Sequence, residues 1–514
     1  MRRLNNPFWL AEAHSAYPAL TEPIEVDVAV VGAGITGTTA AYLLKREGLS
    51  VALLESDRLC AGATGYTTAK LTVGHSLVYR ELIDSFGVET ARAYARSNQE
   101  AIERVAAIVD EHVLDCDFER AGNYVYTEAR GSAGKIEREA EAARAAGIDA
   151  ELTTETDLPY PVAAAIHVPG QAQFHPWKYV AGLAGVVAGD GSHVLERTRA
   201  TGVRAGDPCT VQTTGGPVRA RHVVIATQLP FADRGLFFAK AHPVKSYAIA
   251  ALIEEGHAPR GMYISVDQPT RSVRSTPGEG GRVLIVGGES HRPGEDRDTT
   301  ARYRRLEEFM HERFGVEAPA WHWSTHDYAP LDRLPYIGRL RRNDGRVLVA
   351  TGFSKWGMTK GTLAASILTD AILGRPNEYA ALYDAHRVHL RQSAPSFAKE
   401  NGRVGVAFFR DRLRPRDGRR AIEALKPGEG TIARIGRKQI AAYREDGATL
   451  HLLSARCTHL GCILGWNAAD KAWECPCHGS RFAGDGTLVQ GPATVDLPRE
   501  TLPRVYQSPT LPSA

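Results

Sequence analysis

The chain has 514 residues, of which 43% are hydrophobic and 24% are charged, and its formal net charge is +3. This length exceeds that of one typical domain, and the apolar share excludes a disordered tail or a fibre. Because the charge is nearly balanced, nothing indicates a nucleic-acid-binding or membrane-binding surface.

The first 25 residues predict neither export nor membrane insertion. They contain polar, aromatic and acidic residues, without the apolar run that a secretory signal requires. No segment approaches the ~20 consecutive apolar residues of a membrane-spanning helix. The scattered cysteines Cys60, Cys116 and Cys209 are typical of packed thiols in a reducing compartment. We therefore expect a cytoplasmic protein without a membrane span.

Residues 27–37 form the first motif, an apolar strand that leads into a Gly-x-Gly-x-x-Gly turn, and residues 38–47 have helical composition. In this pattern the glycines allow a tight turn, a close approach to a pyrophosphate, and helix packing on the strand. A second strand, 51–55, ends on a carboxylate at the spacing expected for ribose hydroxyls. A glycine turn without a ligand is the less favoured alternative. The predicted dinucleotide-binding residues are Gly32, Ala33, Gly34, Ile35, Thr36, Gly37 and Glu55.

Two further glycine-rich segments decide which dinucleotide binds. Residues 60–70 are small and polar and suit phosphate and flavin, so we assign Thr67 and Thr68 to the cofactor. Residues 347–361 form another strand, glycine turn and helix. A phosphate-binding P-loop is excluded there, because it needs a lysine directly after its second glycine, where Met358 stands.

Together these motifs resemble the flavoprotein family of D-amino-acid oxidase, glycine oxidase and sarcosine oxidase over roughly residues 25–390. The element at 332–338 also matches. The resemblance implies FAD, and implies that it is non-covalent, because Thr325 or a neighbour stands where sarcosine oxidases carry a cysteine bound to the flavin. It also implies that the late glycine turn brings backbone N–H groups and a helix N-terminus to the pyrimidine end of the flavin. The further residues implied to bind FAD are Ala226, Thr227, Gly352, Trp356, Gly357 and Met358.

The middle of the chain predicts a substrate domain. Short alternating stretches separated by Gly, Pro and Asp favour an antiparallel sheet that is interrupted by returns to the nucleotide domain. Helices are predicted for 90–111 and 299–314. The expected boundaries are 1–390 for the flavoprotein domain, with FAD-binding parts at about 25–110 and 330–390 and a substrate part at about 160–330, then 391–424 for a linker and 425–510 for a C-terminal module.

Two side chains are weak candidates for catalysis. Lys355, beside the late glycine turn, is expected to hold a substrate carboxylate or the flavin, and simple exposure to solvent is the alternative. His175 matches a family position that borders the active-site cavity, but turn chemistry before a proline also accounts for it. Neither is assigned as an acid or base, because catalysis in this family depends mainly on flavin positioning.

The segment 387–426 mixes arginine with aromatic residues. This composition indicates a linker that packs along the flavoprotein domain, or else a solvated basic stretch of chain. A docking site for an acidic electron partner is a third interpretation, because charge steering suits redox encounters.

Near the C-terminus, Cys457-x-His459 and Cys475-x-x-His478 offer two thiolates and two imidazoles. A Rieske [2Fe-2S] cluster requires this mixture, with sulfur on one iron and nitrogen on the other. Zinc is the alternative, but its ligand pairs usually stand two to four residues apart, unlike Cys457 and His459. Such clusters accept single electrons at about −150 to +300 mV, because neutral imidazoles make reduction easier.

This motif resembles the Rieske proteins of cytochrome bc complexes, and the whole chain resembles a bacterial subfamily of fused FAD and Rieske oxidoreductases. The resemblance implies a disulfide between Cys462 and Cys477 that joins the two ligand loops. In a reducing compartment this disulfide has to be shielded by the folded cluster environment. The hydroxyl of Ser480 is implied to donate to cluster sulfur and raise the potential. Phe482 replaces an aromatic hydroxyl donor, so the potential should fall below the upper end of the family.

The expected fold class is α/β plus β. It comprises a Rossmann-type FAD-binding domain, an interleaved antiparallel-sheet substrate domain, and a small all-β Rieske domain. The expected function is oxidation of a small organic substrate, an amine or amino acid by family resemblance, with single electrons passed through the cluster to an external acceptor.

Two alternatives stay open. In the first, NAD(P)H or another donor reduces FAD and the cluster feeds a partner protein, although residues 283–288 lack the third glycine and the helix of a second fingerprint. In the second, the chain is a redox-responsive carrier without its own small substrate, and the Cys462 and Cys477 pair switches the cluster.

Overall fold

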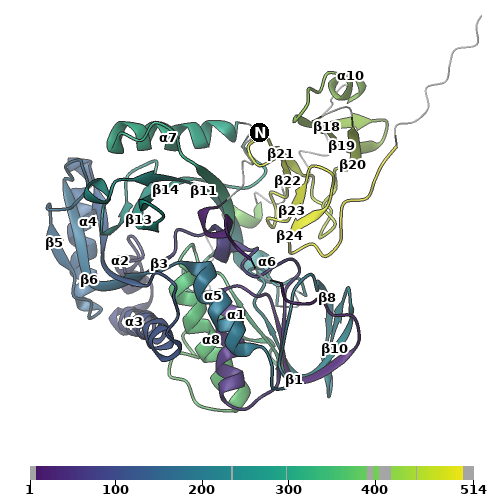
Figure 1. Ribbon diagram of the computed structural model, residues 1–514, viewed down its shortest axis with the longest axis horizontal. Coiled ribbons are helices and arrows are strands. Elements are labelled where there is room, and N and C mark those ends of the chain that lie inside the picture. Colours follow the sequence, from purple (N-terminus) through teal and green to yellow (C-terminus); the bar gives the residue numbers. More distant parts are fainter. Residues whose placement is uncertain are drawn as a thin grey trace, which may run out of the picture.

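The computed structural model describes residues 7–14, 16–232, 235–296, 298–389, 398–402, 405, 418–446 and 449–501. Most of the expected linker 391–424, and the end of the expected module 425–510, lie outside these residues. Figure 1 shows two sheets of the flavoprotein part and a C-terminal β module beside them. Within the described ranges, no helix has both the length and the apolar character needed to span a bilayer.

The nucleotide-binding sheet has the order β16-β17-β10-β1-β2-β7, and a hairpin of β8 and β9 extends from β10. β1 runs parallel to β2 and β10, with Val31 opposite both Leu54 and Ile225. The carboxyl ends of these three strands therefore meet at one edge, as the apolar strand pattern predicts. The strands are β1 (Ile24–Val31), β2 (Val51–Leu54), β7 (His193–Leu195), β8 (Ala200–Arg204), β9 (Cys209–Thr213), β10 (Gly216–Ile225), β16 (Tyr336–Arg341) and β17 (Asp344–Thr351).

Helices cover one face of this sheet. Successive side chains of a strand point to opposite faces, so each buried strand contributes to two separate cores. Val28 and Val30 of β1 pack into the core that contains the apolar faces of these helices, whereas Ala29 and Val31 belong to the core on the other face. Figure 1 shows α1, α5 and α8 side by side on that first face. The helices on this face are α1 (Ile35–Arg46), α5 (Pro176–Val187) and α8 (Gly357–Leu373). α3 (Val88–His112) packs on α8, and α2 (Tyr79–Phe86) contacts both α3 and α4 (Ala133–Ala145), which packs against the second sheet.

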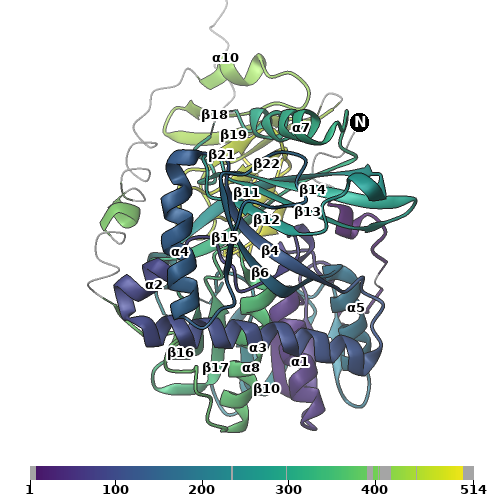
Figure 2. The ribbon, with the colours of Figure 1, turned by 90° about the vertical axis from the view of Figure 1, so that its left-hand side faces the viewer.

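The second sheet has the order β15-β11-β14-β13-β12-β4-β6-β3, with β5 paired to β6. Helix α7 (Thr300–Phe314) covers one face, and a short helix, α6 (Phe237–Lys240), precedes β11. Figure 2 shows β4 and β6 beside α4, which packs against them. The strands are β3 (Lys70–Leu71), β4 (Glu119–Thr127), β5 (Glu151–Thr153), β6 (Ala164–Gln173), β11 (Ala241–Ile253), β12 (Met262–Ser265), β13 (Arg271–Gly278), β14 (Gly281–His291) and β15 (Trp321–Pro330).

The chain passes between the two sheets more often than the expected domain boundaries imply. β3, β4 and β5 of the second sheet precede residue 160, and β7 to β10 of the nucleotide sheet lie inside the range 160–330. Both sheets are mixed, since β12 runs parallel to β4 and β16 runs antiparallel to β17, and each sheet contains strands that are distant in sequence.

The C-terminal module consists of a three-stranded sheet, β18-β19-β20, and a four-stranded sheet, β21-β22-β23-β24. Its buried residues, among them Trp473 and Phe482, form a separate hydrophobic core. Figure 1 shows β22 and β23 next to β11 of the flavoprotein part. Its elements are α10 (Gly418–Glu423), β18 (Gly430–Ile435), β19 (Lys438–Arg444), β20 (Leu450–Ser454), β21 (Gly465–Asn467), β22 (Ala472–Glu474), β23 (Arg481–Ala483) and β24 (Leu488–Gln490).

Candidate active site and metal centre

A cavity of about 500 Å³ lies at the carboxyl ends of the nucleotide-sheet strands. Its walls come from both sheets of the flavoprotein part and from the C-terminal module, which contributes Arg481 and Gln490 among others. Of the residues predicted to bind FAD, only Ala33 and Gly37 do not line it. Those that do are Gly32, Gly34, Ile35, Thr36, Glu55, Thr67, Thr68, Ala226, Thr227, Gly352, Trp356, Gly357 and Met358.

The glycine turn is packed too tightly for side chains. Gly32 has a φ of +102°, and a Cβ built there would lie 2.7 Å from the carbonyl oxygen of Ala226. A Cβ on Gly37 would lie 1.9 Å from the carbonyl oxygen of Gly32. Gly37 therefore does not face the cavity, and its missing side chain lets α1 pack closely against β1. This packing directs the N-terminus of α1 toward the cavity.

Replacing Gly37 by alanine is expected to remove most of the bound FAD. The added methyl group would force α1 away from the turn, and overpacking of this kind costs about 1–3 kcal/mol. The flavin absorbance per chain of purified protein measures the loss. Gly185→Ala in α5 is the matched control, because its Cβ would meet no atom within 4 Å and should leave the FAD content unchanged. Full FAD occupancy in Gly37→Ala would contradict the assigned role.

Glu55 follows β2 and lines the cavity. Its carboxylate accepts hydrogen bonds from the backbone N–H of Ala33 at 2.9 Å and of Asp57 at 3.1 Å, and from the Ser56 hydroxyl at 3.0 Å. Burial raises the pKa of Glu55, and these three donors partly oppose the shift. The carboxylate is thus fixed beside the glycine turn, as the expected contact with an adenosine ribose requires.

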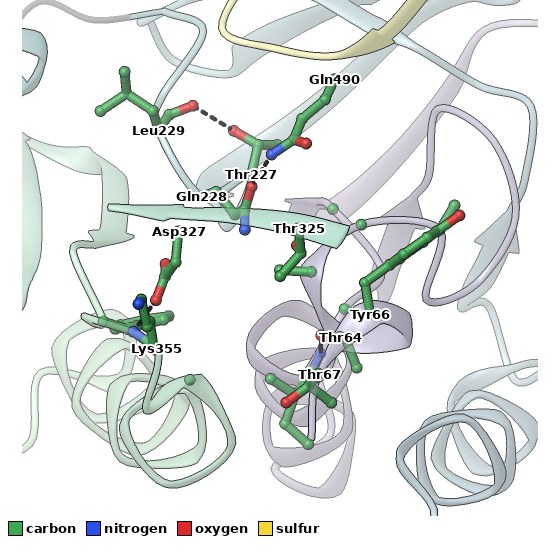
Figure 3. Close-up of a pocket in the computed structure, with 18 of the residues that line it drawn as sticks. Thr64, Tyr66, Thr67, Thr227, Gln228, Leu229, Thr325, Asp327, Lys355 and Gln490 are labelled. Carbon is green, nitrogen blue, oxygen red and sulfur yellow. Dashed lines mark hydrogen bonds between the residues drawn. The ribbon is translucent and has the colours of Figure 1, made fainter. Parts of the chain in front are cut away.

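At the other end of the cavity, the turn before α8 positions Lys355. Ser354 and Lys355 both have left-handed backbones, with φ of +53° and +71°. The backbone N–H of Lys355 donates to the Asp327 carboxylate (Figure 3). Its ammonium group donates to the Ser290 hydroxyl. Although its side chain keeps exposed area inside the cavity, the surrounding protein removes hydration and lowers the pKa of Lys355 to about 8, and Asp327 opposes this shift.

His175, the other catalytic candidate, does not line this cavity, which corrects the expectation from the family position. Its Nδ1 accepts a hydrogen bond from the backbone N–H of Lys178 at 3.3 Å and so caps α5. Its ring packs edge-on against Trp9 at 4.9 Å. The turn chemistry before Pro176 therefore accounts for this histidine.

Lys70 and Asp327 line the cavity but were not among the predicted site residues. The buried ammonium group of Lys70 donates to the carbonyl oxygen of Tyr263 and, at 2.7 Å, to the hydroxyl of Ser272. Burial, with a contribution from Arg274, holds the pKa of Lys70 well below its usual range. The small polar run that ends at Lys70 could have indicated that this lysine lies at the site. No sequence motif indicates Asp327, because only its position on the strand decides which way its side chain points.

The four predicted metal ligands come together between two loops of the C-terminal module. Cys457 and Cys475 lie within hydrogen-bonding reach of each other, and the rings of His459 and His478 are 5.1 Å apart. The buried Nδ1 of His478 has no hydrogen-bond partner among the described residues. Two adjacent sulfurs and two adjacent imidazoles are the donor set of a Rieske [2Fe-2S] cluster, so these residues fit that group.

A disulfide joins Cys462 and Cys477, whose Cα atoms are 6.6 Å apart. The sulfurs of Cys462, Cys475 and Cys477 all lie within 4.8 Å of one another. Because two of these three sulfurs are bonded to each other, only Cys475 of this group is left to bind a metal, and Cys457 is the predicted source of the second sulfur.

Ser480 and Phe482 lie beside the ligand loops. The buried hydroxyl of Ser480 accepts a hydrogen bond from the backbone N–H of Ala493 at 3.1 Å and reaches the sulfur of Cys457. Its hydrogen therefore points toward the sulfur ligands. Phe482 is fully buried opposite Trp473 and offers no hydroxyl.

A buried charge cluster holds the module against the flavoprotein part. The ammonium group of Lys245, from β11, donates to the carboxylates of Asp470 and Glu474. Arg481 lies 3.0 Å from Asp470, and its side chain also lines the FAD-side cavity. Lys245, Asp470 and Glu474 have no exposed side-chain area. The module is thus anchored by charges that lie between the two predicted redox sites.

Comparisons with known proteins support both halves of the chain. The model of the family described as FAD dependent oxidoreductase matches residues 27–371, and the Rieske [2Fe-2S] domain model matches residues 420–503. The protein YhfW of Bacillus subtilis (strain 168), whose name describes a Rieske 2Fe-2S iron-sulfur protein, is 35% identical over 484 residues, which are 94% of each chain.

Two more distant matches concern the flavoprotein part. Gamma-glutamylputrescine oxidoreductase of Escherichia coli (strain K12) is 24% identical over 432 residues, which are 78% of this chain and 97% of that protein. The crystal structure of glycine oxidase from Geobacillus kaustophilus has a similar fold, with a TM-score of 0.60 at 20% identity, and covers 71% of this chain and 99% of that one. The expected combination of a flavoprotein fold with a C-terminal Rieske domain is confirmed.

Proposed function

Because this chain belongs to the FAD dependent oxidoreductase family and ends in a Rieske [2Fe-2S] domain, we propose that it oxidises a small amine or amino acid and passes the electrons singly through the cluster to an external acceptor. When bound, FAD supplies two-electron oxidation of a C–H bond and single-electron release, and the cluster supplies one-electron transfer. The observation that carries this proposal is that one module holds the cluster ligands and also forms a wall of the cavity that is lined by the FAD-binding motifs.

The chemistry of the cavity supports an anionic group on the substrate. The cavity wall contains the amino groups of Lys355 and Lys70, which can act as cations or as neutral hydrogen-bond donors. Ser272 and Ser290 add hydroxyl groups. Such a set suits a carboxylate, and the names of the relatives, gamma-glutamylputrescine oxidoreductase and glycine oxidase, describe amine and amino-acid chemistry. We propose that Lys355 holds the substrate carboxylate.

FAD is proposed to bind without a covalent link. Thr325 lines the cavity at the position that the family comparison singled out, and the described residues that line it include neither cysteine nor histidine. The free cysteines Cys60, Cys116 and Cys209 are buried, which suits the proposed location in a reducing cytoplasm.

An anaerobic screen of amines and amino acids tests the proposed reaction. Bleaching of the flavin absorbance by one of these compounds, followed by the electron paramagnetic resonance signal of a reduced cluster, is the expected result. Bleaching by NADPH but by none of the amines would favour the reductase alternative. No bleaching by any small donor would favour the electron carrier.

Affinity for a carboxylate ligand is expected to fall as the pH rises through about 8. Lys355 is mostly charged below its pKa of about 8 and mostly neutral above it, so about nine-tenths of the molecules carry this charge at pH 7 and about one-tenth at pH 9. Titration of the flavin spectrum with benzoate at each pH measures the dissociation constant, which should rise about tenfold per pH unit above that pKa.

Two substitutions at Lys355 separate this charge from other effects. Lys355→Arg keeps a cation at pH 9 and should retain benzoate affinity there, whereas Lys355→Met should bind weakly at every pH. An unchanged pH dependence in Lys355→Met would show that another group binds the carboxylate.

A further inference from the structure

Strand β15 lies between the FAD-side cavity and the cluster ligand loop. Successive residues of a strand point to opposite faces, and Thr325 and Asp327 both line the cavity. Figure 3 shows these two side chains pointing from β15 to the same side. The alternate residues His326 and Tyr328 contact the module on the other side. One strand therefore touches both sites.

β15 contacts the cluster ligand loop directly at two points, besides its contacts with Asp470 and Glu474. The Tyr328 hydroxyl donates to the carbonyl oxygen of His478 at 2.9 Å, and Nδ1 of His326 is 3.0 Å from the carbonyl oxygen of Gly479. A Cβ on Gly479 would lie 2.9 Å from the Tyr328 oxygen, so the loop has no space to move toward the strand. The ring of Phe238 packs edge-on against His478 at 5.3 Å.

Both β15 side chains act as neutral donors. The Tyr328 hydroxyl is the donor of its bond, because the carbonyl oxygen of His478 can only accept. Burial lowers the pKa of His326 to about 4, which leaves a neutral ring whose Nδ1 carries the hydrogen that faces the Gly479 carbonyl. Hydrogen bonds that fix the cluster ligands and place positive dipole ends near the cluster favour the added electron and so raise the potential.

We propose that β15 is the connection through which electrons pass from the flavin cavity to the cluster, and that Tyr328 is a positioning residue that holds His478 and raises the cluster potential. The direction of flow rests on the proposed function, whereas the effect on potential does not. With FAD and the cluster bound at these sites, each transfer would oxidise the flavin by one electron and reduce one ferric iron to ferrous. A one-electron acceptor protein would reoxidise the cluster between two transfers, and the hydrogen received as hydride would leave to water as a proton.

Potentiometric titration of the FAD-loaded and iron-loaded protein, followed by electron paramagnetic resonance, tests the role of Tyr328 without any substrate. In Tyr328→Phe the ratio of reduced to oxidised cluster at a fixed potential should fall by about threefold to tenfold, and tenfold corresponds to about 59 mV. Tyr336→Phe is the matched control, because this buried tyrosine packs against Phe237 and Arg387. An unchanged potential in Tyr328→Phe, with full iron content, would overturn the role.

Photoreduction of the flavin tests the route. The cluster signal should grow at least tenfold more slowly in His326→Leu than in wild type, and His326→Asn, which keeps a donor near Gly479, should approach the wild-type rate. The two His326 variants still test the role of β15 if the Tyr328→Phe protein loses its cluster. Equal rates in all variants would overturn β15 as the route. A wild-type cluster that stays oxidised beside a reduced flavin would instead overturn the electron transfer of the proposed function.

Discussion

Replacing Cys475 by serine is expected to abolish the cluster and leave the flavin in place. The Cys475 sulfur is buried beside Cys457, and these two sulfurs are proposed to hold one iron, so loss of either leaves that iron without its thiolate pair. Iron per chain should fall from about two to near zero, and the electron paramagnetic resonance signal should vanish. The FAD content should stay close to that of wild type, because the glycine turn that is predicted to bind FAD lies in the other part of the chain.

A buried cysteine elsewhere provides the control for this substitution. Cys209 on β9 is also buried and free, and its sulfur faces the carbonyl oxygen of Gly206 at 3.4 Å. Cys209→Ser should keep iron, signal and FAD. Retention of the signal in Cys475→Ser would refute the ligand assignment, as would zinc in place of iron in the wild-type protein.

Replacing Lys245 by methionine is expected to destabilise the docked C-terminal module by about 3–5 kcal/mol, the usual cost of removing one partner from a buried ion pair. Burial alone would raise the pKa of Glu474, but the charges of Lys245 and Arg481 hold it well below its usual range. Without the ammonium group, the carboxylates of Asp470 and Glu474 would share the single Arg481 charge. Bleaching of the cluster absorbance in urea should then occur at a clearly lower concentration.

An exposed ion pair offers the comparison. Arg92 lies 2.7 Å from Glu89 on the surface of α3, and both side chains are more than half exposed. Arg92→Met should change the free energy of unfolding by less than about 1 kcal/mol. A Lys245→Met protein as stable as Arg92→Met would show that the interface does not depend on the buried charges.

Local motifs predicted much of this molecule because the residues that carry each function stand close together in the chain. The glycine turn and the strand before Glu55 fix the FAD-side cavity through short-range geometry. The two ligand loops likewise carry their cysteines and histidines at fixed spacings, and the folded module only has to bring the loops together.

The remaining features depend on packing between distant segments. Asp327 and Tyr328 are neighbours in sequence, yet strand geometry directs one to the cavity and the other to the cluster loop. The docking of the module depends on Lys245 of β11, which no short motif marks. His175 shows the converse, since a family position suggested an active-site role for a residue that caps a helix.

The central claim is that one chain holds both redox sites and moves electrons between them. Freeze-quench electron paramagnetic resonance after rapid reduction of the flavin, repeated over a hundredfold range of protein concentration, tests this claim most directly. Transfer within the chain predicts a rate of cluster reduction that is independent of protein concentration. A rate that rises in proportion to concentration, or a cluster that remains oxidised, would contradict it.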